Sequence, residues 1–185
     1  QPQNYYTVRD AIEDLENVPV VTDRLEDYGT PLPNITPKSE LARRLRDSHL
    51  LLNHMVTKTR AVAMERFKAL LPGQNFHNLD NNLKSTYTDA SRTQNTIYLR
   101  LEYDKPSGTV VNVRKSMWIH PTLNRAVSVR EAARLQSFPD SFIFCGTKDK
   151  QYQQVGNAVP PLMAQAIADD VAGVLDAYGA KVKNG

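Results

Sequence analysis

One run of period-two alternation in 185 residues limits this chain to a small sheet. Residues 96–103, Thr-Ile-Tyr-Leu-Arg-Leu-Glu-Tyr, alternate in the way that the two faces of a half-buried strand do. A turn over residues 104–108 and a β-branched return over residues 109–113 predict a hairpin, to which residues 117–119 add at most a third strand. So small a sheet is stable only when helices pack against it. The sequence therefore predicts an α+β fold with a small antiparallel sheet and several short helices.

Helical spacing predicts three helices before the hairpin. Thr7 and Asp10 are spaced as a capping box for a helix over residues 8–16. Residues 17–38 are rich in proline and predict a loop, after which helices begin at Ser39 and Thr59. The apolar positions that we expect to point inward are Leu41, Leu45 and Leu52 on the first of these two helices, and Val62, Met64, Phe67 and Leu70 on the second.

Two further helices are expected after the hairpin. Ser128 and Glu131 form a second capping box, and that helix ends before Pro139. Pro161 suits the start of the last helix and Gly179 suits its end. The preceding Gln-Val-Gly-Asn run, residues 154–157, reads as a tight turn or as ligand-binding groups before a helix N-terminus. The last helix carries an apolar stripe of Met163, Ile167, Val171 and Val174.

Positive charge gathers in two stretches of a chain whose net charge is only +3. Residues 41–68 hold seven basic and two acidic residues, and residues 84–134 hold nine basic and four acidic residues. Two such stretches are what a surface facing a polyanion needs. Solvated helix faces have the same pattern, so charge alone leaves both interpretations open.

Cysteine content and hydropathy exclude several classes of protein. The single cysteine, Cys145, cannot form an internal disulfide or a cysteine-based zinc cluster, and we expect no metal. We expect its side chain to be buried and not to be a nucleophile, because no basic neighbour would activate it. No apolar run approaches the ~18 residues of a membrane span, and no leader peptide is visible, so the expected setting is cytoplasmic.

Two C-terminal segments resemble one family closely. Residues 125–146, RAVSVREAARLQSFPDSFIFCG, and residues 151–175, QYQQVGNAVPPLMAQAIADDVAGVL, resemble the last two conserved blocks of bacterial-type DNA (cytosine-5) methyltransferases. Upstream, YLRLEYDKPSGTVV, TVRDAIEDL, LLNHM and ERFKALLPGQNF are similar to segments that precede those blocks, so the resemblance covers almost the whole chain. Two long blocks in the right order are a specific signal.

The resemblance implies a division of the chain into four parts. Residues 1–58 would lead in from a catalytic domain, residues 59–126 would form the target recognition domain, residues 127–150 the penultimate block, and residues 151–185 the last block and C-terminal helix. In the family that helix packs on a doubly wound α/β catalytic domain, which this chain lacks. The chain is therefore expected to be a fragment or the smaller subunit of a split enzyme, of bacterial or phage origin.

The family reaction implied by the resemblance transfers a methyl group from S-adenosylmethionine to C5 of a flipped cytosine. Its catalytic cysteine, its glutamate block and its glycine-rich cofactor strand all lie N-terminal to the segments present here. Glu16-Asn17-Val18 spells the glutamate block but ends a short helix, so we interpret it as coincidence. We expect no catalytic residue on this chain, only part of the S-adenosylmethionine site, and no activity without the N-terminal blocks.

Site residues follow from the resemblance and from charge. Asn157, Ala158 and Val159 resemble the segment that lines the S-adenosylmethionine pocket. Arg125, Arg130 and Glu131 resemble positions that hold the recognition domain together. Phosphate contacts are expected from the basic residues Arg92, Arg100, Arg114 and Lys115, and base contacts from residues 84–96 and 112–117.

The expected partners are double-stranded DNA and the N-terminal catalytic domain or subunit. Self-association of the isolated chain is also expected, because the stripe of the last helix would otherwise be exposed. Two other classes of function stay open. A non-catalytic, stand-alone DNA-binding or regulatory module explains the basic stretches equally well, whereas a structural interaction protein explains the apolar helix but not the family blocks.

Overall fold

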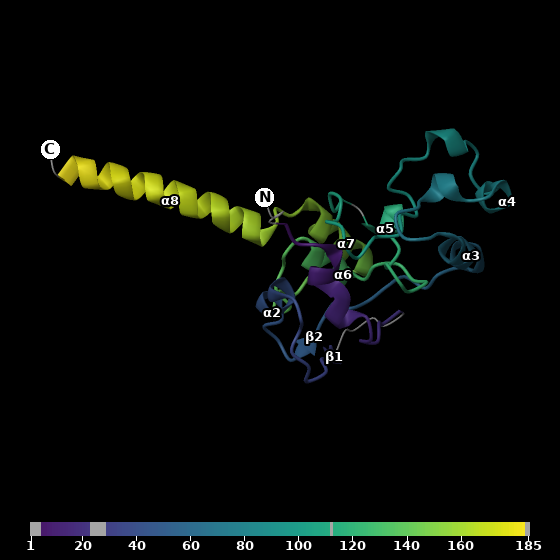
Figure 1. The fold of residues 1–185 in the computed structure, drawn as a ribbon, viewed down its shortest axis with the longest axis horizontal. Coiled ribbons are helices and arrows are strands. Elements are labelled where there is room, and N and C mark those ends of the chain that lie inside the picture. Colours follow the sequence, from purple (N-terminus) through teal and green to yellow (C-terminus); the bar gives the residue numbers. More distant parts are fainter. Residues whose placement is uncertain (1–4, 23–28, 112, 184–185) are drawn as a thin grey trace.

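The computed structural model describes residues 5–22, 29–111 and 113–183, in which helices are joined by long extended segments (Figure 1). The helices are α1 (Val8–Ile12), α2 (Glu40–Leu45), α3 (Ala61–Ala69), α4 (Asn81–Lys84), α5 (Val113–Ser116), α6 (Val129–Leu135), α7 (Lys148–Asn157) and α8 (Pro161–Lys183). Short 3-10 helices span Glu13–Leu15, Phe76–Asn78 and Ala90–Arg92. The strands β1 (Thr30–Pro31) and β2 (Leu50–Leu51) pair antiparallel, with Thr30 opposite Leu51. The fold is α+β.

Side-chain caps start α1 and α6, as the sequence predicts. The hydroxyl of Thr7 accepts from the N–H of Asp10, and the Asp10 carboxylate accepts from the N–H of Thr7 at 2.9 Å. Ser128 and Glu131 repeat this arrangement at α6, where the Ser128 N–H donates to Glu131 Oε2 at 2.8 Å. These caps satisfy N–H groups that have no partner inside the helix. Both predicted capping boxes are confirmed.

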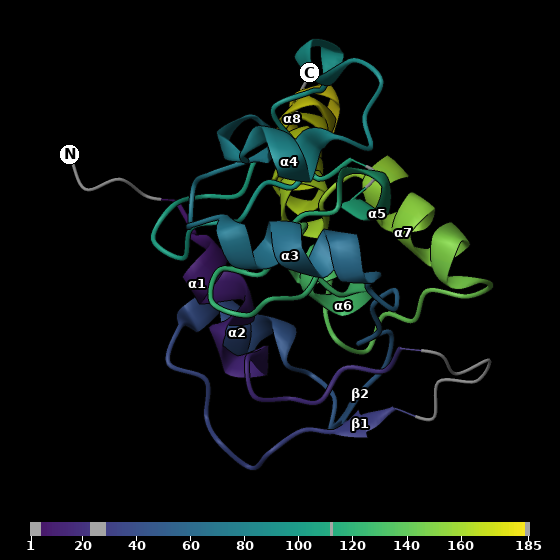
Figure 2. The same cartoon turned by 90° about the vertical axis from the view of Figure 1, so that its right-hand side faces the viewer.

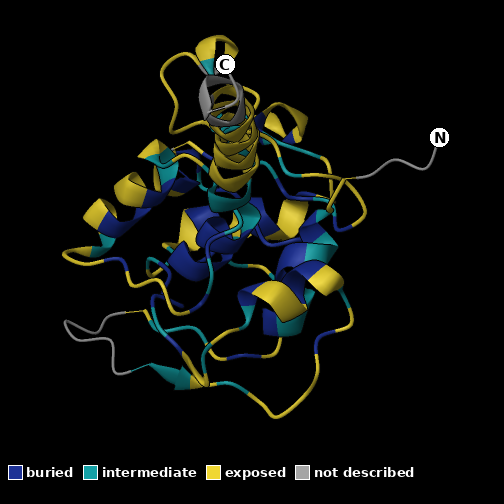
Figure 3. Cartoon of the chain, turned by 90° about the vertical axis from the view of Figure 1, so that its left-hand side faces the viewer, coloured by how far each residue is buried: buried dark blue, intermediate teal, exposed yellow. Residues whose placement is uncertain are grey.

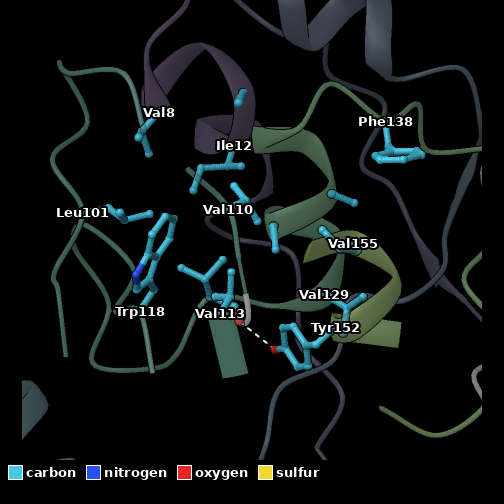
Figure 4. Packing of buried hydrophobic residues seen from close by; sticks show 14 of the residues in the cluster. Val8, Ile12, Leu101, Val110, Val113, Trp118, Val129, Phe138, Tyr152 and Val155 are labelled. Carbon is cyan, nitrogen blue, oxygen red and sulfur yellow. Dashed lines mark hydrogen bonds between the residues drawn. The ribbon is translucent and has the colours of Figure 1, made fainter. Parts of the chain in front are cut away.

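The main core lies where α1, α6 and α7 meet two extended segments (Figure 4). Trp118 is fully buried in it, between Leu101 and Val113 (Figure 4). Tyr152 of α7 is also buried, and its hydroxyl donates to the carbonyl of Val127 at 2.7 Å. A second cluster lies beneath α3 and includes Phe67, Phe76, Leu79, Tyr98 and Ile119. A third, smaller cluster contains Leu15, Val18 and Leu51, so packing between helices and extended segments takes the place of a larger sheet in the described residues.

The hairpin expected over residues 96–113 does not form. Tyr98 has a φ of 54°, which interrupts any extended strand at its third residue. Of the backbone N–H groups that would form one ladder, two donate to one segment, Tyr98 to Ser116 and Leu101 to Ile119, whereas Arg100 donates to Gln74. Within the described residues, Ile119 forms isolated bridges with Arg100 and Ala126 in place of the possible third strand. The end of the expected return strand instead leads into α5. The alternation is real as a burial pattern, but it belongs to an irregular extended segment.

Two helix boundaries also differ from expectation. α2 ends at Leu45 because Arg46 has a ψ of 72°, so Leu52 lies beyond the helix, next to β2. α8 begins at Pro161 as expected but continues through Gly179 to Lys183. Glycine lowers helix stability by about 1 kcal/mol without having to end the helix.

α8 projects away from the body of the molecule (Figures 1 and 3). At its base Leu162 packs against the main core, and Arg44 donates a hydrogen bond to Gln165 at 2.9 Å. The predicted stripe of Met163, Ile167, Val171 and Val174 is between 52% and 70% exposed. The described helices include none long and apolar enough to cross a membrane.

Candidate nucleic-acid interface

A cleft of about 540 Å³ is lined by residues of α3, α5 and α7, the helices labelled in Figure 2. Residues 57–66 and 113–117 supply most of its lining, and α7 contributes Tyr152. Val62 and Met117 give its floor an apolar part. Val62 is 47% exposed there, which corrects the expectation that it points into the core. Its lining residues are Thr57, Lys58, Thr59, Arg60, Val62, Ala63, Arg66, Thr86, Tyr98, Val113, Arg114, Lys115, Met117, Ala126, Val127 and Tyr152.

The charge of this cleft is positive. Its exposed rim carries Lys58, Arg60, Arg114 and Lys115, and no carboxylate belongs to the described residues that line it. Asp149 of α7 lies just outside and forms an ion pair with Arg114 at 2.6 Å. An open groove with a basic rim and a partly apolar floor favours a polyanionic ligand with flat or apolar groups.

Gly156 sets the distance between α7 and the loop that precedes α5. A Cβ atom at Gly156 would lie 2.1 Å from the carbonyl oxygen of Val111. The loop at residues 110–111 can approach α7 this closely only because residue 156 has no side chain. The glycine lies in the last turn of α7, not in the turn that we expected there.

The four predicted phosphate-contacting residues lie in three different places. Arg114 and Lys115 line the cleft. Arg92 is outside it, with an 87% exposed side chain that pairs with Asp89 at 3.4 Å. Arg100 is 4% exposed and lies in the interior. Asn112, within the predicted base-reading range 112–117, lies outside the described residues.

Arg100 is a structural residue, which corrects its predicted role. Its guanidinium donates to a set of backbone carbonyls and one side chain, with nitrogen–oxygen distances of 2.6–3.1 Å: Phe67, Leu70, His120, Leu123 and Asn124 Oδ1. Burial lowers the pKa of Arg100. A guanidinium enclosed in this way does not reach a ligand at the surface.

Two exposed cations of the cleft are not among the residues predicted from the sequence. Lys58 and Arg60 belong to the first basic stretch, residues 41–68, but the predicted phosphate contacts include no residue of that stretch. The signals available in the sequence were the charge of this stretch and the position of Lys58 and Arg60 just before α3. The structure places them in one cleft with Arg114 and Lys115 of the second stretch.

Arg125 and Glu131 form a buried ion pair beside the cleft. The two Nη atoms of Arg125 donate to the two carboxylate oxygens of Glu131 at 2.6 and 2.7 Å. Burial disfavours a charged carboxylate, but the hydrogen bonds and charge of Arg125 outweigh it and hold the pKa of Glu131 at about 2. His54 and His120 are fully buried nearby, and burial lowers the pKa of His120 to about 4.

Arg130 joins α6 to two loops. It donates to the carbonyls of Leu52, Pro139 and Phe142 at 2.6–2.9 Å. Asn53 adds a further acceptor at 3.3 Å. All three residues that the resemblance assigns to the scaffold are therefore largely enclosed, with partners on other segments.

The residues expected near the cofactor connect α7 to α8. Asn157 is the last residue of α7, and Ala158 and Val159 follow it. Asn157 and Val159 are exposed and Ala158 is half-buried, so an amide and backbone groups face outward at the base of α8.

Cys145 is exposed, which corrects the expectation of a buried thiol. It follows the buried Phe144, and its carbonyl accepts a hydrogen bond from Gln154 at 2.8 Å. Glu16 follows the 3-10 helix after α1 and hydrogen-bonds to Thr122, while Val18 is buried. A metal-binding group of His, Cys, Asp or Glu is absent from the residues that the structure describes.

Comparisons with known proteins find relatives of this chain. The model of the C-5 cytosine-specific DNA methylase family matches residues 3–173. The chain is 32% identical over 186 residues to the type II methyltransferase M.DdeI of Desulfomicrobium norvegicum, covering 91% of this chain and 43% of that protein. It is 40% identical over 125 residues to the type II methyltransferase M1.HphI of Haemophilus parahaemolyticus, covering 68% and 32%.

The fold is also similar to that of a solved protein. A DNA modification methyltransferase encoded within an E. coli prophage aligns with a TM-score of 0.69 at 21% identity, covering 95% of this chain and 49% of that one. In each of these three comparisons the chain spans less than half of its relative's length.

Proposed function

The chain belongs to the C-5 cytosine-specific DNA methylase family, and from this premise we propose that it is the DNA-recognition part of a DNA (cytosine-5) methyltransferase. S-adenosylmethionine would supply the methyl group, and a catalytic part outside this chain would carry the nucleophile. The observation that carries the proposal is the basic cleft between α3, α5 and α7.

The cleft is suited to the backbone of double-stranded DNA. Lys58, Arg60, Arg114 and Lys115 would contact phosphates along its rim, which positions a duplex without reading its sequence. Base contacts would come from the exposed residues 84–96 and from the α5 region, entering the major groove where all four base pairs differ. Arg92, on the exposed Ala90–Arg92 helix, would contact phosphate beyond the cleft.

The segment from α7 to α8 would face the catalytic part. Asn157, Ala158 and Val159 would complete one wall of the S-adenosylmethionine site, because their outward groups lie at the base of α8. The exposed stripe of α8 would pack on the catalytic part, covering a surface that a stable protein rarely leaves in water. Arg125, Arg130 and Glu131 would keep the recognition part rigid while DNA is bound.

The test is a methyl-transfer assay with radiolabelled S-adenosylmethionine and mixed-sequence duplex DNA. The chain is assayed alone, then mixed with a polypeptide that supplies the catalytic blocks of its family. Activity only in the mixture supports the proposal. Activity of the chain alone overturns the proposal. Inactivity of both samples also overturns it; if the chain then still binds DNA in a salt-sensitive way, it is a non-catalytic DNA-binding module.

A matched pair of variants tests the cleft itself. Lys58→Gln with Arg60→Gln removes two rim charges, and each lost phosphate contact lowers the slope of log K against log salt by about 1. The control, Lys38→Gln with Lys105→Gln, also removes two charges, from side chains that are 88% and 67% exposed and lie outside the cleft lining. An unchanged slope in the double variant would argue against the cleft as the duplex-binding surface.

A further inference from the structure

Arg66 connects α3 to the exposed segment of residues 83–93, which we name the outer segment. The arginine is 4% exposed, although it lies on a short surface helix. Its Nε donates to the carbonyl of Leu83 at 2.8 Å, and one Nη donates to the hydroxyl of Thr86. The other Nη donates to the hydroxyl of Tyr98 at 2.9 Å. One guanidinium therefore joins the outer segment to the second core.

Aromatic rings enclose the same guanidinium. Its carbon lies 5.2 Å from the ring centroids of both Tyr87, in the outer segment, and Tyr98, in the core. The Tyr87 ring packs on Phe76 at a centroid distance of 4.4 Å. Arg66 thus occupies the position where the outer segment meets the rest of the molecule.

Apart from Leu83 and Tyr87, which pack against the second core, the outer segment has little packing. Most of its described residues are exposed, and in Figure 1 it lies at the end of the molecule opposite α8. His77 hydrogen-bonds to the carbonyl of Thr93 at 2.8 Å, and Lys84 donates to the carbonyl of His77 at 2.8 Å. Thr86 lines the basic cleft together with Arg66. The position of the outer segment relative to the cleft therefore depends strongly on Arg66.

We propose that Arg66 is a positioning residue for sequence discrimination, an inference that rests on the function proposed above. It holds the outer segment at the edge of the cleft, so that polar side chains of that segment meet the base edges of a bound duplex. Base readout by hydrogen bonds tolerates errors of only about 0.5 Å, so a segment that shifts loses discrimination before it loses affinity. Arg66 itself acts through the segment.

The experiment uses the complete methyltransferase, with its catalytic part, and duplexes that contain its methylation site or a single base change. Arg66→Lys keeps the charge but cannot serve the acceptors of Leu83, Thr86 and Tyr98 together. Thr86→Ala leaves Arg66 in place and removes one of its acceptors in the outer segment. Lys68→Met is the control, because Lys68 lies exposed on the same helix and pairs only locally with Glu65 at 3.0 Å.

We expect Arg66→Lys to reduce the ratio of kcat/KM between correct and altered duplexes about tenfold, and Thr86→Ala to reduce it less. The KM for S-adenosylmethionine and the salt slope of DNA binding stay at wild-type values, because charge is retained. Hydrogen exchange of residues 83–93 becomes faster in both variants. Lys68→Met changes neither discrimination nor exchange.

Two results would overturn the inference. One is faster exchange in residues 83–93 with unchanged discrimination. The other is an equal loss of kcat/KM on all duplexes, which would mean that Arg66 supports only the stability of the enzyme. If Arg66→Lys does not fold, Thr86→Ala decides by the same two criteria. A wild-type enzyme that methylates no DNA would instead refute the proposed function, before any variant is compared.

Discussion

Replacing Glu131 by glutamine tests whether the buried ion pair beside the cleft holds the fold together. Glu131 is fully buried and accepts three hydrogen bonds, two from Arg125 and one from the Ser128 N–H. Glutamine has nearly the same shape but is neutral and has one acceptor oxygen. The variant therefore leaves a guanidinium whose side chain is only 14% exposed without its counter-charge.

Two independent routes give the size of the effect. Removing one member of a buried ion pair costs about 3–5 kcal/mol. The pKa of Glu131 falls from 4.5 to about 2, and at roughly 1.4 kcal/mol per unit this corresponds to about 3 kcal/mol of stability at pH 7. Domains of this size unfold with about 5–15 kcal/mol, so the loss is a large fraction of the total.

The assay is urea unfolding followed by the fluorescence of Trp118, the single tryptophan, which is fully buried. At pH 7 we expect Glu131→Gln to lose about 3 kcal/mol. A carboxylate with a lowered pKa stabilises the fold above pH 4.5, and that contribution disappears as the pH falls towards 2. The difference between variant and wild type should therefore shrink over the same interval.

The control is Glu65→Gln, which breaks an exposed ion pair with Lys68 at 3.0 Å. Exposed pairs contribute at most about 1 kcal/mol, so this variant should unfold close to wild type. A loss below about 1 kcal/mol for Glu131→Gln at pH 7, or a loss that does not depend on pH, would refute the reasoning.

Three further outcomes are expected. Gly156→Ala should lose stability and weaken DNA binding, because the new Cβ displaces the loop that precedes α5 and its two rim cations. Gly173→Ala has open space around it on α8 and should gain about 0.5–1 kcal/mol of stability; urea unfolding compares the two variants. The stability of the wild-type chain should fall as the pH drops from 6.5 to 4, because in this interval the unfolded chain binds a proton at His120 that the folded chain does not. In the same assay, His120→Asn should reduce the dependence of stability on pH. The isolated chain should self-associate at high concentration through the exposed stripe of α8, and the Ile167→Glu variant should be monomeric. Analytical ultracentrifugation measures both, and a wild-type chain that stays monomeric would contradict this prediction.

Local capping signals in the sequence predicted the starts of α1 and α6 correctly. The capping boxes at Thr7 and Ser128 depend on residues three positions apart, so the sequence contains all the information that they need. The expected hairpin depended on which distant segments pair, and the positive φ of Tyr98 removes the ladder that the alternation suggests. Alternation of apolar and polar residues indicates only that one side of a segment is buried. The irregular segment of residues 96–103 runs across both cores and therefore alternates in the same way as a strand.

The candidate site was predictable only in outline. Charge indicated two basic stretches, but not that Lys58 and Arg60 share a cleft with Arg114. Arg100 and Arg114 belong to the same basic stretch, and only tertiary contacts decide that one is buried among carbonyls while the other is exposed. Cys145 follows a buried phenylalanine, and neighbouring side chains of an irregular loop can face opposite sides.

The hydrogen bonds of Arg100 and Arg130 tolerate amino-acid substitution at the residues that accept them. Most of their hydrogen bonds end on backbone carbonyls, which every amino acid carries. A substitution at an acceptor position therefore alters a side chain and leaves the partner of the arginine in place. The segments that supply these carbonyls can vary their side chains while the connections that hold them stay the same.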